Sequence, residues 1–309
     1  MRIAFFGTPD FAVPTLRALA KTVHDLAVFT QPDRPVGRKA VLTPPPVKAA
    51  ALELGLPVYQ FEKIRSQEGR DAIRAFGPDL YAVVAFGQLF SEENLSIPPL
   101  GAINVHGSLL PLYRGASPMQ QSVMDGQKVV GVSTMRLVKR MDAGDILLQA
   151  ETPLGENETY GELSVRLAEL GADLFLKTLD ALLEGRLSPV PQDEEKATYC
   201  KMLTRDSGRI DLNAPRQAVH DLIRGTNPWP GAYAQLGEEK LKLWRTVLSD
   251  AESPADLPVG GLFGDQKRGL FLRCGDGTLE ITELQAPGGK KLDGKTFLRG
   301  RNIAGSVLS

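Results

Sequence analysis

Hydrophobic and polar positions in the first half of the chain alternate between short apolar runs and longer segments with helical periodicity. The short runs are about four to eight residues long and end at glycine or polar residues, as buried strands do. The run 79–86 is nearly continuously apolar, which is typical of a strand covered on both faces of a parallel sheet. The pattern predicts strands at 2–6, 25–30, 57–60, 79–86 and 101–105.

The segments between these runs predict helices at 14–22, 44–54, 66–76, 118–126 and 159–184. Thr43 is expected to cap the second of these helices, with Pro44 in its first position. Thr159 and Glu162 form a capping box before the last one. Strands that alternate with helices predict an α/β fold, here a Rossmann-like domain with a mainly parallel sheet. Two further runs, 129–138 and 146–152, are expected as an antiparallel pair at its edge.

The pattern changes after residue 185. Residues 186–206 contain prolines and an acidic cluster but no periodicity, and they are interpreted as containing a linker. Beyond them lie one helical segment and several short β-like runs separated by glycines, which predict a small OB-like β-barrel. The helix is expected at 215–224 and the strands at 231–236, 239–247, 269–274 and 278–285. The expected organisation is an α/β domain at 1–189, a linker at 190–206 and a barrel at 207–309.

Composition places the chain among ordinary globular proteins. It has 309 residues, 42% hydrophobic and 24% charged, which is enough for about two domains. No apolar run approaches the ~20 residues that span a bilayer, so no membrane association is expected. Cys200 and Cys274 form neither a metal-binding spacing nor a disulfide framework, so we expect a cytoplasmic protein. A monomer is the default expectation.

Charge distinguishes the two parts of the chain only weakly. The net charge is −1, but residues 201–309 carry 16 lysines and arginines against 13 aspartates and glutamates. This excess is a weak indication of a polyanionic partner. An ordinary solvated surface explains it at least as well.

Several common catalytic and cofactor motifs are absent from the sequence. There is no GxxxxGK[ST] phosphate loop, no HExxH and no GxSxG. The first strand is followed by Gly7-Thr8-Pro9-Asp10-Phe11 instead of the GxGxxG that holds a dinucleotide pyrophosphate. The sequence therefore argues against a nicotinamide-dependent oxidoreductase.

An amide and an imidazole close the run at 101–105. Asn104 and His106 are two residues apart, so in a strand they point to the same side. Ligands of open α/β sheets bind beyond the carboxyl ends of the strands, where this pair is expected to lie. A buried polar pair bonded to nearby backbone is the alternative. Of the three histidines in the chain, His106 is the best placed for proton transfer near neutral pH.

A carboxylate in the loop at 140–145 could complete this pair. Asp142 lies between two predicted strands, and a plain turn is the alternative interpretation of its loop. Placed against His106, its carboxylate would hold the ring in one tautomer and stabilise the protonated form. Together the three groups suit direct acyl transfer, with Asn104 donating to the oxyanion and His106 stabilising it or moving a proton.

Two stretches of this sequence, INVHGSLLPLYRGASP at 103–118 and MDAGDILLQ at 141–149, resemble the folate-dependent formyltransferases. The resemblance implies that Asn104, His106 and Asp142 are catalytic and that the formyl donor is 10-formyltetrahydrofolate. It implies no metal. It also implies a folate site lined by Ser108, Leu109, Leu110 and Pro111.

Three further stretches bear on the acceptor: FGTPDFAVPTL at 6–16, TQPDRPVGRKAVLTPPPVKAAA at 30–51 and NPWPGAY at 227–233. They resemble family members that formylate methionyl initiator tRNA for translation initiation, which implies that tRNA is the partner. Sugar formyltransferases share the SLLP-x-YRG and DPWPGA-like segments, so an amino sugar nucleotide is the alternative acceptor. A folate- or RNA-binding regulator without catalysis is the third hypothesis, and the intact catalytic trio argues against it.

Basic residues in two regions are candidates for RNA contacts, since arginine and lysine position a nucleic acid through its phosphates. The loop 31–43 is rich in proline and basic residues, and 287–301 is a second basic cluster. In the family the loop commonly has glycine after its second arginine and then more lysines, so Lys39-Ala40-Val41 predicts a weaker grip here. A solvated surface is the alternative for both regions. The expected contacts are Arg34, Arg38, Lys39, Lys48, Lys290 and Lys291.

The two tryptophans are expected to pack and not to stack on bases. Trp229 lies between Pro228 and Pro230, as a packing anchor would. Trp244 alternates with polar neighbours, as a half-buried strand residue does.

Overall fold

The computed structural model describes residues 1–37 and 40–309, which form two compact units. The first unit comprises Met1–Gly115, Gly131–Thr152 and Ser164–Tyr199. The second comprises Ala116–Val130, Pro153–Leu163 and Cys200–Ser309, so it takes two short segments from the middle of the chain. Within the described residues, no helix combines the length and the apolar character needed to cross a membrane.

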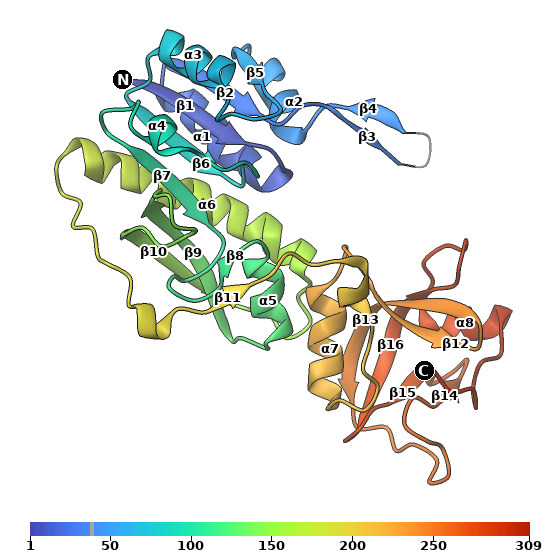
Figure 1. Ribbon diagram of the computed structural model, residues 1–309. Coiled ribbons are helices and arrows are strands. Elements are labelled where there is room, and N and C mark those ends of the chain that lie inside the picture. Colours follow the sequence, from blue (N-terminus) through green and yellow to red (C-terminus); the bar gives the residue numbers. More distant parts are fainter. Residues whose placement is uncertain (38–39) are drawn as a thin grey trace. The chain divides into compact units, whose positions relative to one another are not determined.

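Seven strands form the sheet of the first unit (Figure 1). In spatial order they are β10 (Ile146–Pro153), β9 (Val129–Arg136), β7 (Ala102–His106), β6 (Leu80–Val84), β1 (Arg2–Gly7), β2 (Asp25–Thr30) and β5 (Val58–Gln60). The pairs β1/β2, β1/β6, β2/β5 and β6/β7 run parallel, whereas β7 and β9 run antiparallel. Every residue of β6 is buried. The expected mainly parallel sheet, with two further strands at one edge, is confirmed.

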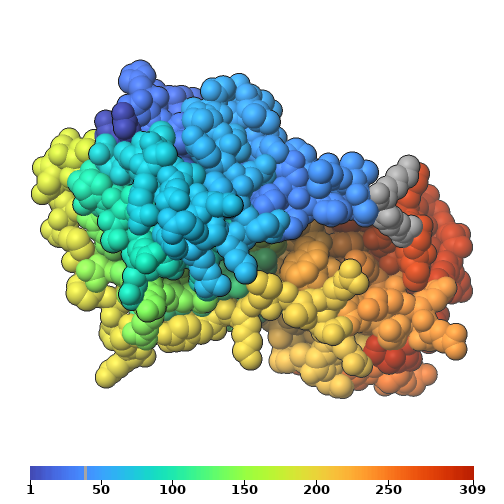
Figure 2. All heavy atoms as spheres, turned by 45° about the horizontal axis from the view of Figure 1, so that its top comes forward, coloured from blue at the N-terminus to red at the C-terminus, as the bar shows by residue number. Residues whose placement is uncertain are grey.

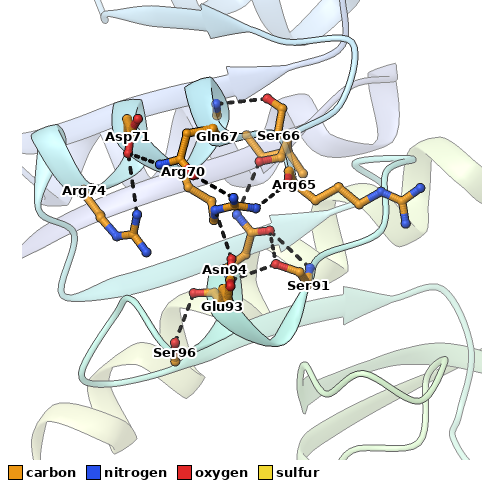
Figure 3. Close-up of polar contacts among 12 residues, drawn as sticks. Arg65, Ser66, Gln67, Arg70, Asp71, Arg74, Ser91, Glu93, Asn94 and Ser96 are labelled. Carbon is orange, nitrogen blue, oxygen red and sulfur yellow. Dashed lines mark hydrogen bonds and ion pairs between the residues drawn. The ribbon is translucent and has the colours of Figure 1, made fainter.

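The helices of the first unit begin and end at recognisable signals. Ser66 accepts a hydrogen bond from the Gly69 backbone N–H at 3.2 Å, and Gly77 ends the same helix in the left-handed conformation, φ 64°. Figure 3 shows this cap beside that of Ser91 and Asn94, whose side chains and backbone N–H groups bond reciprocally. The helices are α1 (Val13–Thr22), α2 (Pro46–Glu53), α3 (Gln67–Phe76), α4 (Glu92–Leu95) and α6 (Tyr160–Leu183), with 3-10 turns at Asp10–Ala12 and Glu194–Lys196.

A glycine lets α6 approach the sheet closely. A Cβ on Gly171 would lie 2.9 Å from Cγ1 of Val105 on β7, closer than carbon atoms normally come. The long helix therefore packs directly against the strand that carries Asn104 and His106. The capping box expected before α6 is also present, with Thr159 N–H donating to Glu162 and Glu162 N–H donating to Thr159.

The start of α2 differs from the sequence expectation. Its N-cap is Pro45, and Thr43 makes no capping bond because it belongs to β4 (Val41–Thr43), which pairs antiparallel with β3 (Arg34–Val36). The Thr43 hydroxyl donates to the Val41 carbonyl at 2.9 Å instead. This short hairpin extends from the unit as an exposed arm (Figure 1, Figure 2).

Five antiparallel strands form the sheet of the second unit: in order, β12 (Ala232–Leu236), β13 (Glu239–Ser249), β16 (Thr278–Gln285), β15 (Gly269–Arg273) and β14 (Leu262–Asp265). Its helices are α5 (Pro118–Met124), α7 (Arg216–Gly225) and α8 (Gly294–Gly300), with a 3-10 turn at Arg205–Gly208. The sequence predicted four of these strands together with α5 and α7. It missed β14 and α8, which are four and seven residues long and too short for a periodic signal.

Residues 306–309 join the two edge strands of this sheet. Ser309 exchanges two backbone hydrogen bonds with Gln235 of β12, at 2.7 and 2.9 Å. On the other side, the Leu262 N–H of β14 donates to the Ser306 carbonyl and the Leu308 N–H donates to the Gly260 carbonyl, both at 2.8 Å. The segment thus lies between β12 and β14 and closes the small barrel. Leu308 is buried in the core of this unit.

His220 of α7 is a buried, neutral histidine in the second unit. Its Nε2 donates to the Glu156 carbonyl at 3.0 Å, and its Nδ1 lies 2.9 Å from the Thr246 hydroxyl. Burial lowers the pKa of His220, and the nearby Arg224 lowers it further, against opposing effects of the Glu156 backbone and Asp221. Folding therefore favours the neutral ring.

Acid should destabilise the protein partly through His220. The unfolded chain protonates this residue near the ordinary pKa of about 6.5, while the folded state resists protonation. Its stabilising contribution is therefore complete above about pH 6.5 and is lost as the pH falls toward the lowered pKa. Between about pH 7.5 and pH 5 we expect His220→Gln to lose less Tm than the unmodified protein. If calorimetry gave parallel profiles of Tm against pH for the two proteins, His220 would not contribute to the acid destabilisation.

Candidate active site

Asn104 and His106 lie on one face of β7 at its carboxyl end. They are buried, with 9% and 6% of their surface exposed. In the ladder Asn104 is opposite Val83 of β6 and Met135 of β9, so the rigid centre of the sheet fixes its position. Within residues 1–37 and 40–309, no hydrogen bond engages the Asn104 side-chain amide. Its N–H donors are not committed to the protein.

The surroundings of His106 define its tautomer. Nε2 lies 2.9 Å from the Tyr113 carbonyl oxygen. Because a carbonyl can only accept, Nε2 carries the proton in the neutral ring. Nδ1 lies 3.8 Å from Oδ1 of Asp142, which is an ion-pair distance but too long for a hydrogen bond. In the neutral ring Nδ1 is therefore the basic atom, and it faces a carboxylate.

Asp142 is held in a specific orientation in the loop between β9 and β10. Its backbone has φ 47°, in the left-handed region that residues other than glycine seldom adopt. Oδ2 accepts a hydrogen bond from the Gly115 N–H at 2.8 Å, which leaves Oδ1 turned toward His106. The structure thus places Asp142 against His106, as the family resemblance implies. The Tyr113 carbonyl, and not this carboxylate as expected, fixes the tautomer of the neutral ring.

The stretch expected to line a folate site is folded back onto β9. The Ser133 hydroxyl donates to the Ser108 carbonyl at 2.7 Å and accepts from the Leu110 N–H at 3.0 Å. Gln149 adds a hydrogen bond to the Leu110 carbonyl at 2.9 Å. Ser108 and Leu110 are buried, whereas Leu109 and Pro111 are partly exposed.

Sequence reasoning missed the residues that hold this site together. Ser133 and Gln149 fix the Ser108–Pro111 stretch, and Gln192 donates to the carbonyls of Asp142 and Gly144 at 2.8 and 2.7 Å. Gln192 lies in the segment interpreted as a linker. No periodicity or motif marks it, so the sequence carried no signal for its role.

The candidate RNA contacts of the first unit differ in exposure and in the ion pairs that they already make. Arg34 on β3 is exposed and pairs with Glu62 at 2.6 Å. Lys48 is only about one-fifth exposed and donates to both oxygens of Asp33 at 2.8 and 2.9 Å and to Gln60. The hydrogen bonds that Asp33 accepts from Lys48 and then from the Gln60 amide hold the pKa of its carboxyl below the ordinary value. Arg38 and Lys39 lie outside the described residues.

The candidates of the second unit lie beside a cluster of cations and aromatic rings. Lys290 and Lys291 are exposed, and the Lys291 ammonium lies 3.8 Å from the ring centre of Trp244. Lys242 approaches the same ring at 5.0 Å, and Lys240 lies 3.7 Å from the Tyr233 ring.

The two tryptophan predictions have different outcomes. Trp244 is 7% exposed and its indole N–H donates to Gln285 at 3.0 Å, so its expected packing role is confirmed. Trp229 is 50% exposed, so its expected role as a packing anchor is wrong. The flanking prolines constrain the backbone there without burying the ring.

No group of three or more histidine, cysteine, aspartate or glutamate side chains in the described part of the chain could hold a metal ion. The arrangement in the first unit is an uncommitted amide donor, an imidazole with one basic nitrogen and a fixed carboxylate. These are the groups needed to stabilise an oxyanion and to move a proton.

Comparison with known proteins identifies the class. Residues 1–179 match the family model described as formyl transferase, and residues 202–302 match the model of the formyl transferase C-terminal domain. The chain therefore belongs to the formyl transferase family and is an enzyme.

Curated relatives identify the group within this family. A protein of Trichlorobacter lovleyi named methionyl-tRNA formyltransferase is 45% identical over 99% of this chain and 96% of its own length. One of Listeria monocytogenes with the same name is 42% identical over 98% and 97%. The chain falls in this group of formyltransferases.

Solved structures of lower identity share the fold. HypX from Aquifex aeolicus, in complex with tetrahydrofolic acid, aligns with a TM-score of 0.66 at 16% identity, covering 96% of this chain and 47% of its own. The sugar 3N-formyl transferase WlaRD, solved with dTDP and 5-N-formyl-THF, aligns with a TM-score of 0.67 at 17% identity, covering 94% and 98%. At these identities the likeness concerns the fold alone.

Proposed function

We infer that this enzyme transfers the formyl group of 10-formyltetrahydrofolate to the α-amino group of methionyl initiator tRNA. The observation that carries the chemistry is the arrangement of Asn104, His106 and Asp142 at the carboxyl end of β7. The observation that favours this acceptor is the name shared by relatives that match nearly the whole chain. Translation initiation is the process served by such a product.

The tautomer of His106 suggests the route of the proton. The amine attacks the formyl carbon, a C–N bond forms, and the carbonyl oxygen becomes an oxyanion that accepts hydrogen bonds from the Asn104 amide. Nδ1 of His106, the basic atom, accepts the proton that the attacking nitrogen loses. The resulting imidazolium faces Asp142 and adds positive charge beside the oxyanion.

The second half of the reaction returns this proton. The bond between the formyl carbon and N10 of the folate breaks, and the departing nitrogen takes the proton from Nδ1 of His106. The imidazole returns to its starting tautomer because Nε2 keeps its bond to the Tyr113 carbonyl throughout. No covalent enzyme intermediate is needed, so both substrates bind together.

The folate site is proposed along the stretch from Ser108 to Pro111. The buried Ser108 and Leu110 shape this stretch through Ser133, while the partly exposed Leu109 and Pro111 offer apolar surface to a pteridine or benzoyl ring. Arg34, Arg38, Lys39, Lys48, Lys290 and Lys291 remain the proposed residues for the RNA interaction, and the structure describes all of them except Arg38 and Lys39. Arg34 is the exposed cation at the base of the arm, and Lys48 acts through Asp33 to fix that base.

On the second unit the proposed RNA surface is the cluster of Lys240, Lys242, Lys290 and Lys291 with Tyr233 and Trp244, to which the half-exposed Trp229 can add a stacking ring.

The acceptor is tested by single-turnover transfer from 10-formyltetrahydrofolate to initiator Met-tRNA, elongator Met-tRNA and an amino sugar nucleotide. We expect rapid transfer to the initiator tRNA alone. Transfer to the sugar nucleotide alone would show that the proposed acceptor is wrong and that the proposed formyl-transfer chemistry is right. Tight folate binding with no transfer to any acceptor would contradict the enzymatic proposal itself.

Lys291→Gln tests the RNA surface of the second unit. If Lys291 meets a phosphate, its loss should weaken tRNA binding and reduce the slope of log Kd against log salt by about 1. Lys21→Gln, which removes an exposed lysine at the end of α1, is the matched control and should leave the slope unchanged. If the slope of log Kd against log salt were the same in both variants, Lys291 would not belong to the proposed RNA surface.

A further inference from the structure

We propose that Gln192 is a positioning residue for catalysis, because its side-chain amide holds the Asp142 backbone so that the carboxylate faces His106. This inference rests on the proposed role of Asp142 in formyl transfer. It assigns a catalytic task to a segment that the sequence presents as a connection between domains.

The loop around Asp142 needs an external support. With φ 47°, Asp142 adopts a strained backbone conformation that persists only where surrounding contacts hold it. The loop's own support is weak at this point, since Ala143 N–H reaches the Arg140 carbonyl only at 3.4 Å. Gln192 supplies two short bonds instead, to the carbonyls of Asp142 and Gly144 at 2.8 and 2.7 Å. One amide group thus holds both sides of the strained turn.

The side chain of Gln192 is itself fixed by a hydrogen bond from Arg114. Its Oε1 accepts from Nε of Arg114 at 2.9 Å, which fixes the orientation of the amide and turns its two N–H groups toward the loop. Arg114 has no exposed side-chain surface. Its guanidinium makes two further bonds to the carboxylate of Glu194, at 3.0 and 3.2 Å, and one to the Tyr199 hydroxyl at 3.1 Å. Hydrogen bonds from Arg114 and, to a smaller extent, from Arg140 hold the pKa of Glu194 below its ordinary value, so this carboxylate stays charged near neutral pH.

The backbone around Arg114 connects this support to the catalytic pair. The preceding residue, Tyr113, presents the carbonyl that fixes Nε2 of His106, and the following residue, Gly115, donates to Asp142. Thr198 anchors the same stretch, because its carbonyl accepts from the Arg114 N–H and its hydroxyl from the Tyr113 N–H, both at 2.8 Å. Residues 192–199 therefore reach Asp142 by two routes, through Gln192 and through Gly115.

Gln192→Glu isolates the donor function. Glutamate has the same size and can still accept from Arg114, but it has no N–H to offer the two carbonyls. Gln192→Ala removes both contacts. For both variants we expect kcat of formyl transfer to initiator Met-tRNA to fall about 10- to 100-fold, with KM for folate and tRNA changed less than about twofold, because displacing a reacting group by about 1 Å carries such a cost. Gln217→Ala removes an amide that donates two hydrogen bonds to Asp221 in the second unit, and it should leave kcat unchanged.

A double-mutant cycle separates positioning from general damage. If Gln192 acts through Asp142, Gln192→Glu should cause no further loss of kcat in an Asp142→Ala background. Equal fractional losses in both backgrounds would overturn the proposal, as would unchanged kcat in both Gln192 variants. Asp142→Ala alone reports on the proposed function: if it transfers formyl groups at the unmodified rate, the catalytic assignment of Asp142 fails first. A thermal melt of each variant verifies that kcat refers to folded protein.

Discussion

Asn104→Ala is expected to lower kcat for formyl transfer about 10²- to 10³-fold, the usual cost of losing one oxyanion donor. The Asn104 amide has no partner within the described residues and lies in the fixed centre of the sheet, so it can donate to a developing charge without reorganising. Because an oxyanion exists only in the transition state and the intermediate, folate affinity should change little. Single-turnover transfer and an equilibrium titration with folate measure the two quantities separately.

Asn104→Asp sharpens this test, since it keeps the shape and exchanges the donor for a negative charge. It should be at least as impaired as the alanine variant. Asn213→Ala removes an exposed asparagine of the second unit and serves as the control. A rate within a few-fold of the unmodified enzyme in both Asn104 variants would remove Asn104 from the reaction. His106→Ala should also be strongly impaired, and its loss should not multiply fully with that of Asn104 if both act on one intermediate.

The shared position of Asn104 and His106 was predictable because two strong regularities coincide at β7. A strand repeats every two residues, and parallel sheets bind ligands at their carboxyl ends, so Asn104 and His106 could be placed together from sequence alone. The contact with Asp142 required the resemblance to a family, since nothing local to residues 140–145 indicates where that loop folds. The pair of His106 and Asp142 is long-range and depends on the order of β7 and β9 in the sheet.

The elements that escaped prediction lack such regularities. Every residue of strands β3 and β4 is exposed, so no alternation of burial marks them. Thr43 was expected to start a helix, but it pairs across the two strands instead. Gln192 meets Asp142 across 50 residues of chain through a side-chain amide, a contact that no local pattern specifies. Polar residues in irregular segments acquire their roles from the tertiary fold, and only the structure reveals them.

Arg224→Met is expected to lower the free energy of unfolding by about 3–5 kcal/mol, because it leaves a buried carboxylate without its partner. Nε of Arg224 lies 2.6 Å from Oδ1 of Asp221, and the two side chains are only 5% and 4% exposed. Arg224 also donates to the carbonyls of Gly155 and Glu158, at 3.2 and 3.3 Å. Without it, the hydrogen-bond donors that remain on Asp221 within the described residues are those of the Gln217 amide.

The pair of Asp265 and Arg268 provides a matched comparison, with the same spacing and a distance of 2.7 Å but side chains 48% and 72% exposed. Arg268→Met should therefore cost far less than Arg224→Met. In the double variant Asp221→Leu with Arg224→Met, most of the stability should return, because the unpaired charge is gone and apolar side chains fill the space. Urea unfolding with unchanged m-values measures all four proteins on one scale. An Arg224→Met variant that loses no more free energy of unfolding than Arg268→Met would contradict this prediction. Burial would then add nothing to the contribution of the pair, and the apolar contacts of α7 alone would hold it to its unit.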